Sequence, residues 1–297
     1  DAESGDRFGF SVSASSNKIA VGAPEKQNQG SVYVFDTDGT NEVVLSSSEL
    51  NGLFGFSIAN TDDWVVIGSP GENSNQGAVY IESLAGQPSV KITAADGSSG
   101  DQFGYSVAIL GDRIVIGSLN HNSTGAVYVY NINGTLETKL TASDAFANDL
   151  FGHSVAINSQ LIAVGAPRED TEGPDAGSVY LYNINNAYSE TKISASDGAG
   201  YDEFGYSVDL DEEFLAVGAP NSDNTDESTG ALYVYSTIDY TETKLIPADI
   251  TEQDRLGNSV AVGANKISVG AFRDSDTESR AGSAYVFDIV QRGSTEI

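Results

Sequence analysis

Phe103-Gly-Tyr-Ser-Val-Ala-Ile-Leu-Gly-Asp-Arg-Ile-Val-Ile-Gly117 is the stretch that decides the fold, because its pattern occurs six times along the chain. In each copy a glycine, usually preceded by phenylalanine, is followed 13 residues later by a second glycine, and then by Gly-x-x-Tyr. The copies recur every 46 to 53 residues from one end of the 297-residue chain to the other. A period of this size indicates a repeat architecture.

One copy has the composition of four short strands. In the third copy we expect strands over 103–109, 114–117, 125–130 and 138–142, separated by residues that favour turns. The first three strands are apolar on both faces, as in Val127 and Tyr128, so one sheet cannot bury itself and needs a neighbour on either side. The sequence therefore predicts an all-β fold, a six-bladed β-propeller of four-stranded antiparallel blades.

The predicted blades fill the whole chain. We expect one domain over residues 1–297, with blades near 1–47, 48–95, 96–143, 144–196, 197–248 and 249–297. The fourth strands of four blades carry a lysine, which predicts a charged, solvent-exposed outer edge. Both chain ends fall within the outer strand of the last blade. This predicts contact with other domains of a longer chain or with identical subunits.

Composition excludes several classes of function. The chain has no cysteine, so thiol nucleophiles and thiolate metal sites are excluded. Its net charge of −29 argues against nucleic acid and anionic membrane surfaces as partners. The charge favours solubility, cation binding, or life in salty water, where self-repulsion is screened. No apolar run of 18 residues is present, so we expect no membrane insertion.

The motifs resemble a known family. Phe151-Gly-His-Ser-Val-Ala156, Val164-Gly-Ala-Pro167 and Gly177-Ser-Val-Tyr-Leu-Tyr182 are similar to the FG-GAP repeat of integrin α-subunit β-propellers and of their bacterial and marine relatives. The resemblance implies an extracellular or cell-surface location and a role in adhesion. It also implies calcium loops of the form Asp-x-Asp-x-Asp-Gly between the first and second strands. The corresponding turns here are short and do not fit that form, so those cation sites are not carried over.

Charge is distributed unevenly between the two ends of the predicted blades. The fourth-to-first and second-to-third loops emerge at the same end of an up-and-down blade. More than half of the 43 acidic residues belong to these loops, but fewer than half of the 14 basic ones do. We call this end the acidic end and expect it to contain the binding surface.

Two groups of acidic residues are candidate Ca²⁺ ligands, because calcium binds six to eight oxygen atoms. The first group lies in the second-to-third loops of blades four to six, which are longer than those of blades one to three: Asp170, Asp175, Asp223, Asp226, Asp274, Asp276 and Glu278. The second group recurs seven and two residues before the Phe-Gly position: Asp96, Asp101, Asp197 and Asp202. The alternatives are a solvated acidic loop for the first group and a hydrogen-bonded turn for the second.

No catalytic group stands out among the repeats, so we expect no enzyme. The two histidines, His121 and His153, lie one repeat apart and are poor metal partners, and His153 occupies a position that predicts packing. Asn122 and Asn133 begin glycosylation acceptor patterns, a match close to chance in a chain of this composition.

The sequence thus predicts a non-catalytic extracellular binding or adhesion module that recognises a protein or polysaccharide ligand, with Ca²⁺ on its acidic loops. One alternative is a structural subunit or spacer of a surface appendage or larger exoprotein. The second alternative is a polysaccharide-cleaving enzyme.

Overall fold

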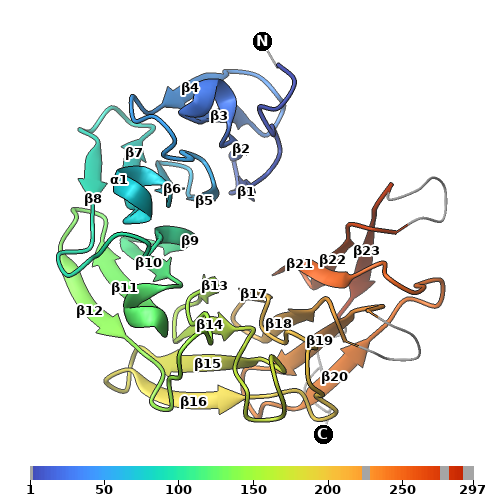
Figure 1. Cartoon of the computed structure of the whole chain (residues 1–297). Helices are drawn as coiled ribbons and strands as arrows, with labels where there is room; N and C mark the ends of the chain where they lie inside the picture. The colour runs from blue at the N-terminus through green and yellow to red at the C-terminus, as the bar shows by residue number, and fades with distance from the viewer. Residues whose placement is uncertain (1–2, 223–227, 275–280, 290–297) are drawn as a thin grey trace, which may run out of the picture. The chain divides into compact units, whose positions relative to one another are not determined.

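The computed structural model describes residues 3–222, 228–274 and 281–289. The chain packs as two compact units, 1–156 and 157–297, which are described separately (Figure 1). Nearly all its regular elements are strands. The helical elements among the described residues are the four-residue α1 (Glu72–Asn75) and the 3₁₀ turns Lys26–Asn28 and His121–Ser123. No helix in the described ranges is long and apolar enough to cross a membrane.

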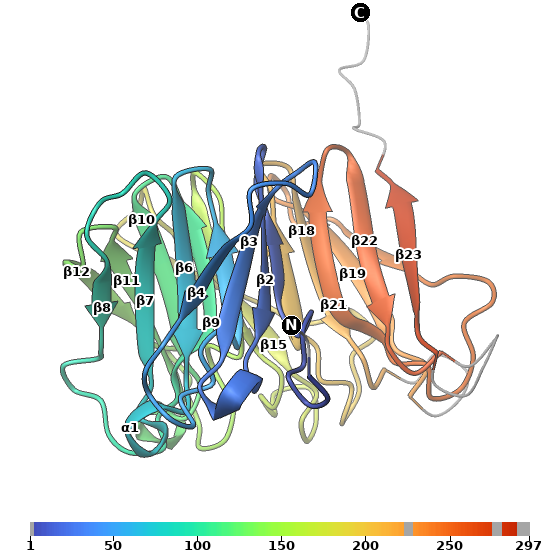
Figure 2. The ribbon, with the colours of Figure 1, turned by 90° about the horizontal axis from the view of Figure 1, so that it is seen from above.

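The first unit contains three antiparallel sheets, each with its strands in chain order. The first sheet is β1 (Val12–Ala14), β2 (Lys18–Ala23), β3 (Ser31–Asp36) and β4 (Val43–Ser46). The second is β5 (Ser57–Asn60), β6 (Trp64–Ser69), β7 (Ala78–Ser83) and β8 (Val90–Ile92). The third is β9 (Phe103–Leu110), β10 (Arg113–Ser118), β11 (Ala126–Asn131) and β12 (Leu136–Leu140). Figure 2 shows these sheets standing side by side.

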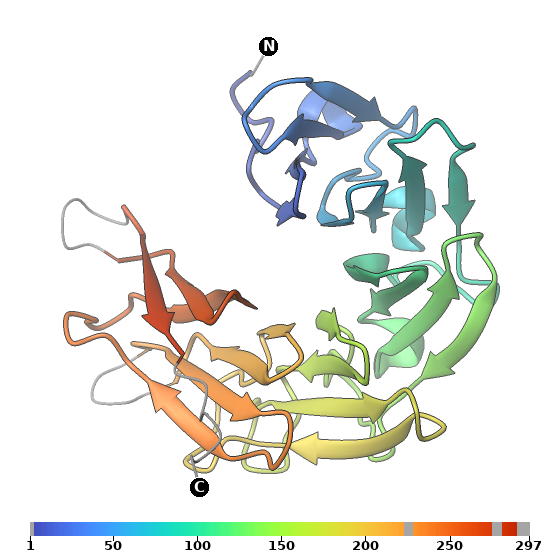
Figure 3. The same ribbon diagram turned by 180° about the vertical axis from the view of Figure 1, so that it is seen from behind.

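The remaining sheets follow the same order (Figure 3). The fourth sheet is β13 (Ser154–Ile157), in which the division between the units falls, β14 (Leu161–Ala166), β15 (Ser178–Asn183) and β16 (Ser189–Ile193). The fifth is β17 (Ser207–Leu210), β18 (Phe214–Ala219), β19 (Ala231–Ser236) and β20 (Glu242–Leu245). The sixth is β21 (Leu256–Gly263), β22 (Lys266–Ala271) and β23 (Ser283–Asp288).

These six up-and-down sheets are the blades of a β-propeller, and the predicted all-β fold is confirmed. In the third blade each observed strand overlaps the predicted one. The largest shift is in β12, which begins at Leu136, two residues earlier than expected. The outer strand predicted for the sixth blade falls in residues 290–297, which lie outside the described residues.

Both faces of an inner sheet are buried, as its two-sided apolar pattern predicts. In the second sheet, Val65 and Ile67 pack in one cluster with Val32 of the first sheet. Val66 and Ile81, on the other face, pack with residues of the third sheet. Side chains of successive residues in a strand point to opposite faces, so one strand can supply both clusters.

Successive sheets are held together by a repeated contact that we call the inter-sheet joint. Phe103 is fully buried, and its backbone N–H donates to the carbonyl of Gln76 in the preceding sheet, with an N···O distance of 3.0 Å. Ser57 Oγ of the preceding sheet donates to the Gly104 carbonyl at 2.8 Å. A Cβ on Gly104 would lie 2.6 Å from the Ala78 carbonyl oxygen, and its φ of +87° also favours glycine. From the second sheet onward, the Phe-Gly of the repeat (Leu-Gly in the sixth sheet) is therefore the part that contacts the sheet before it.

Candidate functional site

The two sets of loops at the acidic end touch each other, as the predicted topology requires. Asn51, in the loop before the second sheet, donates its backbone N–H to the Asn28 carbonyl in a second-to-third loop at 2.6 Å. Asn148 does the same to Ser123 at 2.7 Å, and Tyr201 to Pro174 at 2.6 Å. The acidic loops therefore form a layer at this end of the sheets within each unit.

In five of the six repeats, an aspartate two residues before the Phe-Gly position makes a hydrogen bond that closes its own loop. Asp101 Oδ2 accepts the backbone N–H of Ser98 at 2.8 Å, and Asp202 Oδ2 accepts that of Ala199 at 3.0 Å. Both carboxylates are buried. The same contact recurs at three more positions: Asp6, Asp149 and Asp254. These are the contacts of a hydrogen-bonded turn.

The aspartate seven residues before Phe-Gly binds a tyrosine and a lysine of its own sheet. Asp96 Oδ1 accepts from the Tyr128 hydroxyl at 2.8 Å, and Asp96 Oδ2 accepts from Lys139 Nζ at 2.6 Å. The hydrogen bond from Lys139 is the main reason that the pKa of Asp96 falls to about 2. Asp197 binds Tyr233 and Lys244 in the same way, at 2.8 and 2.7 Å.

We expected the lysines of the fourth strands to be simply solvated at an exposed outer edge, but they make specific contacts. Lys139 and Lys244 also lie over the rings of Tyr128 and Tyr233, with Nζ 5.0 and 4.9 Å from the ring centroids. Each is opposite its tyrosine in the β-sheet register. The Tyr-Lys-acid arrangement thus fastens the outer strand to the acidic loops.

A second position that the sequence analysis missed supplies the acid in other blades. In the second repeat, which has no aspartate before Phe-Gly, Glu72 Oε2 lies 2.6 Å from Lys91 Nζ, and Glu72 Oε1 accepts from the Tyr80 hydroxyl at 2.5 Å. Glu169 pairs with Lys192 at 2.9 Å in the fourth blade. The sequence contains a signal for this position, because the residue four positions after the second glycine is polar in every repeat. All six of these residues are buried: Lys26, Glu72, His121, Glu169, Ser222 and Asp274.

The two histidines lie in different surroundings. Buried His121 places Nδ1 2.7 Å from Asp101 Oδ2, and its Nε2 is 2.7 Å from Lys139 Nζ. His153 packs against the Tyr105 ring with a centroid separation of 5.2 Å, which confirms its packing role.

His153 belongs to an aromatic row that the sequence analysis also missed. The rings of Phe10, Phe56, Tyr105 and His153, each the residue after the first glycine of its repeat, follow one another at 5.0, 5.0 and 5.2 Å. Phe10 is exposed and the other three are partly exposed. These residues begin just after the acidic loops, so apolar and acidic groups lie at the same end of the sheets.

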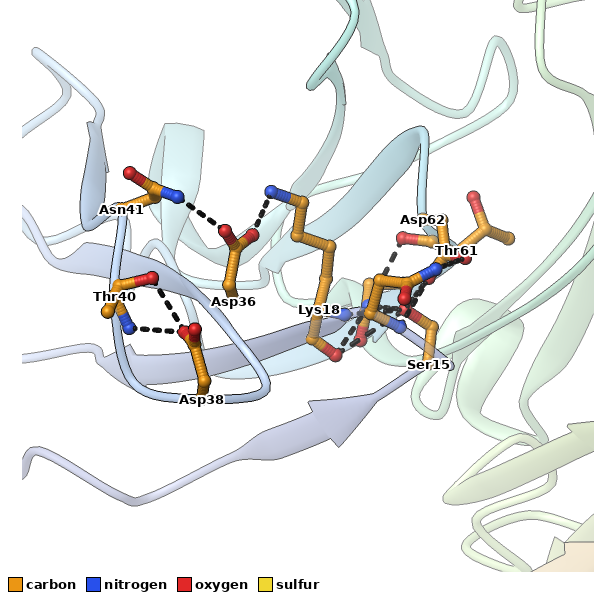
Figure 4. Close-up of polar contacts among 10 residues, drawn as sticks. Ser15, Lys18, Asp36, Asp38, Thr40, Asn41, Thr61 and Asp62 are labelled. Carbon is orange, nitrogen blue, oxygen red and sulfur yellow. Dashed lines mark hydrogen bonds and ion pairs between the residues drawn. The ribbon is translucent and has the colours of Figure 1, made fainter.

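At the opposite end of the first two sheets, Asp62 and Asp36 take part in polar contacts within the chain (Figure 4). Asp62 accepts from Ser15 Oγ at 2.6 Å and from the Asn17 backbone N–H at 2.9 Å. These hydrogen bonds lower the pKa of Asp62. Asp36 binds Asn41 and Lys18, and its pKa is lowered for the same reason. Asp62 and Asp36 are therefore both engaged in contacts within the chain.

The candidate calcium residues in the long loops of blades four to six are only partly described. Asp170 is exposed, and its Oδ1 accepts the backbone N–H of Asp175 in the same loop at 2.8 Å. Asp274 is buried and accepts from the Tyr285 hydroxyl at 3.0 Å. Asp223, Asp226, Asp276 and Glu278 lie outside the described residues. Within the described ranges, no three His, Asp or Glu side chains gather as a metal site requires.

Comparison with known proteins agrees with the geometry. A family model described as "FG-GAP repeat" matches residues 1–35, 88–130, 135–182, 188–235 and 240–287. Most of the second repeat lies between these matches, yet it forms the same four-stranded sheet.

Two curated relatives are similar to part of the chain. Integrin alpha-7 of Rattus norvegicus is 34% identical over 110 residues, which is 32% of this chain and 10% of that protein. Integrin alpha-7 of Mus musculus is 34% identical over 110 residues, which is 32% of this chain and 9% of that protein. The aligned region thus spans about a tenth of these relatives. The family matches cover well over half of this chain and coincide with its sheets, and the chain belongs to the FG-GAP repeat family.

Proposed function

We propose that this chain is a non-catalytic extracellular or cell-surface binding module of the adhesion type, with a protein or polysaccharide as its ligand. The observation that supports this most is the FG-GAP repeat found along the chain, together with its similarity to integrin alpha-7. Because the similar region is about a tenth of that integrin, the integrin's own partners are not assigned to this chain.

The acidic end is the surface that we propose for the ligand. Asp170 is exposed, the Asp96 side chain is half exposed, and exposed Phe10 adds apolar area beside the loops. Aromatic side chains are enriched at binding surfaces, and acidic loops attract a partner that presents positive charge. The opposite end uses Asp62 and Asp36 in contacts within the chain.

Calcium is proposed only for the long loops of blades four to six. The oxygens of Asp96, Asp101, Asp197 and Asp202 already accept hydrogen bonds from protein donors, so these residues fit a metal ion poorly. Asp170 accepts one backbone N–H, that of Asp175 in the same loop, but it is exposed to solvent, so this pair fits better. They would supply hard oxygen ligands, which Ca²⁺ prefers.

Calorimetric titration with CaCl₂ tests the calcium proposal. We expect heat of binding and a raised Tm, both reduced in the Asp170→Asn/Asp175→Asn double variant. The Asp63→Asn/Asp112→Asn double variant removes the same charge at the opposite end and should bind as the parent chain does. No heat and no change in Tm at millimolar calcium would contradict the proposal.

Ligand binding itself is tested with an array of polysaccharides and extracellular-matrix proteins, probed with the labelled chain with and without a chelator. Retention of a polysaccharide or protein supports the module. Cleavage of an arrayed polysaccharide would instead favour the enzyme.

A further inference from the structure

The outer strand of the first sheet, β4, lacks the lysine that the outer strands of the next four sheets share. Those strands carry it opposite a tyrosine of the neighbouring strand: Lys91, Lys139, Lys192 and Lys244. In β4 the corresponding residue is Val44, opposite Tyr33, and all four residues from Val43 to Ser46 are uncharged. Lysine on an edge strand discourages pairing with a further strand, so β4 is without this protection.

The contact between a lysine and the tyrosine ring is nevertheless kept in the first sheet, because a loop residue supplies it. Buried Lys26 places its Nζ 4.9 Å from the centroid of the Tyr33 ring and contacts the Tyr33 hydroxyl. The corresponding distance from Lys139 Nζ to the Tyr128 ring is 5.0 Å. The tyrosine therefore keeps its cation, while the outer strand loses its charge.

The edge of β4 is open to a further strand. β4 is the last strand of its sheet, and no other strand in the described part of the chain pairs with it (Figure 1). About half of the N–H and C=O groups of such a strand point away from the sheet. Val43 is 46% exposed, although it lies opposite Val34 on the face that packs against the second sheet. Both sheets belong to the first unit, so this exposure is a property of that unit alone.

Carboxylates lie at both ends of this uncharged edge. Exposed Glu42 directly precedes β4, and Asp38 in the turn before it is exposed as well. Beyond the other end, the Glu49 side chain is 56% exposed, and its Oε1 lies 4.0 Å from Lys91 Nζ. A segment that is apolar in the middle and basic at its ends complements this pattern. A second copy of this chain does not, because it brings the same carboxylates and a net charge of −29.

We propose that β4 is a docking edge for a partner protein, which adds an extended segment, apolar in the middle and flanked by lysine or arginine, as a fifth strand of the first sheet. Main-chain hydrogen bonds supply the affinity in this mode of binding, and the side chains of the added strand supply the specificity. The added side chains would pack beside Val43 on one face and Val44 on the other. The inference concerns an outer edge rather than the acidic end, and it does not depend on the ligand proposed there.

Fluorescence anisotropy with the labelled peptide Lys-Lys-Val-Thr-Val-Thr-Val-Lys-Lys tests the proposal. We expect saturable binding to the chain that weakens as salt is added. The same peptide with alternate backbone nitrogens methylated keeps its charge but cannot pair as a strand, and it should not bind. In the peptide complex, amide hydrogen exchange should slow in residues 43–46 and stay unchanged in 136–140.

Two variants return a charge to the edge. Val44→Lys restores the lysine of the other outer strands, and Val43→Lys places one on the other face, away from Lys26. We expect each to weaken peptide binding several-fold. Leu136→Lys is the matched control, because it adds the same charge at a 46% exposed position of another outer strand, and it should bind as the parent chain does.

Three results would overturn the proposal. The first is absence of saturable binding, and the second is equal binding of the methylated peptide. The third is concentration-dependent self-association that Val44→Lys abolishes, which would show by light scattering that a second copy occupies the edge. Circular dichroism establishes that each variant is folded. The methylated peptide and the exchange measurement use the parent chain, so they decide the matter even if a variant does not fold.

Discussion

Lys139 Nζ lies 2.6 Å from Asp96 Oδ2 and ties the outer strand of the third blade to the loop that enters it. The same carboxylate accepts from the buried Tyr128 hydroxyl. The arrangement accounts for two repeated features of the sequence, the fourth-strand lysine and the aspartate before Phe-Gly, through one contact.

Asp96→Asn tests that contact through its pH dependence. The pKa of Asp96 is about 2 in the folded chain, against 3.8 ordinarily, so the carboxylate stabilises the fold above pH 3.8 and loses this effect as pH falls toward 2. Because the Asp96 side chain is half exposed, we expect a loss of only about 0.5–1 kcal/mol at pH 7. Urea unfolding at pH 7 and at pH 2 measures it.

Asp112→Asn is the control for that measurement, since it removes the same charge from an exposed residue with no ion pair among the described residues. It should change the unfolding free energy little at either pH. An Asp96→Asn effect that is equally large at pH 2 would show that the loss comes from something other than the ion pair.

Phe103→Ala should destabilise the chain far more than Phe8→Ala. The first removes a fully buried ring from an occupied joint, for which a loss of about 3–5 kcal/mol is typical. The second removes a ring that is 54% exposed, and we expect a loss of less than about 1.5 kcal/mol. Chemical unfolding of both variants makes the comparison. Equal losses would contradict the assignment of Phe103 to a sheet-to-sheet contact.

Comparing Gly104→Ala with Gly100→Ala separates the steric effect of the contact between sheets from the cost of backbone strain. Gly104 and Gly100 have φ values of +87° and +92°, so alanine at either position has a similar backbone cost of about 1–2 kcal/mol. Only at Gly104 would the new Cβ lie 2.6 Å from a carbonyl of the neighbouring sheet. We expect a clearly lower Tm for Gly104→Ala than for Gly100→Ala. Matching Tm values would contradict a steric requirement for glycine in the repeated inter-sheet contact.

The strands of the fold could be predicted because they depend on local pattern. Glycines at fixed spacing and β-branched runs such as Ile114 to Ile116 determine the strands and turns without long-range information. That the chain forms a single domain over 1–297 stays a prediction.

The acidic loops could not be interpreted from the sequence in the same way. Whether an aspartate is a ligand or a structural group depends on which donors other segments bring to it. Asp96 meets Lys139 from a strand 43 residues away, and Glu72 replaces the missing aspartate of the second repeat from another loop. Neither lysine is close in sequence to the acid that it binds. The spacing of the carboxylates, taken alone, was therefore consistent with a cation site.

Binding through the acidic end is the central claim, and retention of the labelled chain on arrayed polysaccharides and matrix proteins tests it most directly. The account predicts that Asp170→Asn/Asp175→Asn reduces retention several-fold, while Asp63→Asn/Asp112→Asn, with the same charge change at the opposite end, leaves it unchanged. Equal retention by both double variants, or loss only in the second, would contradict the claim.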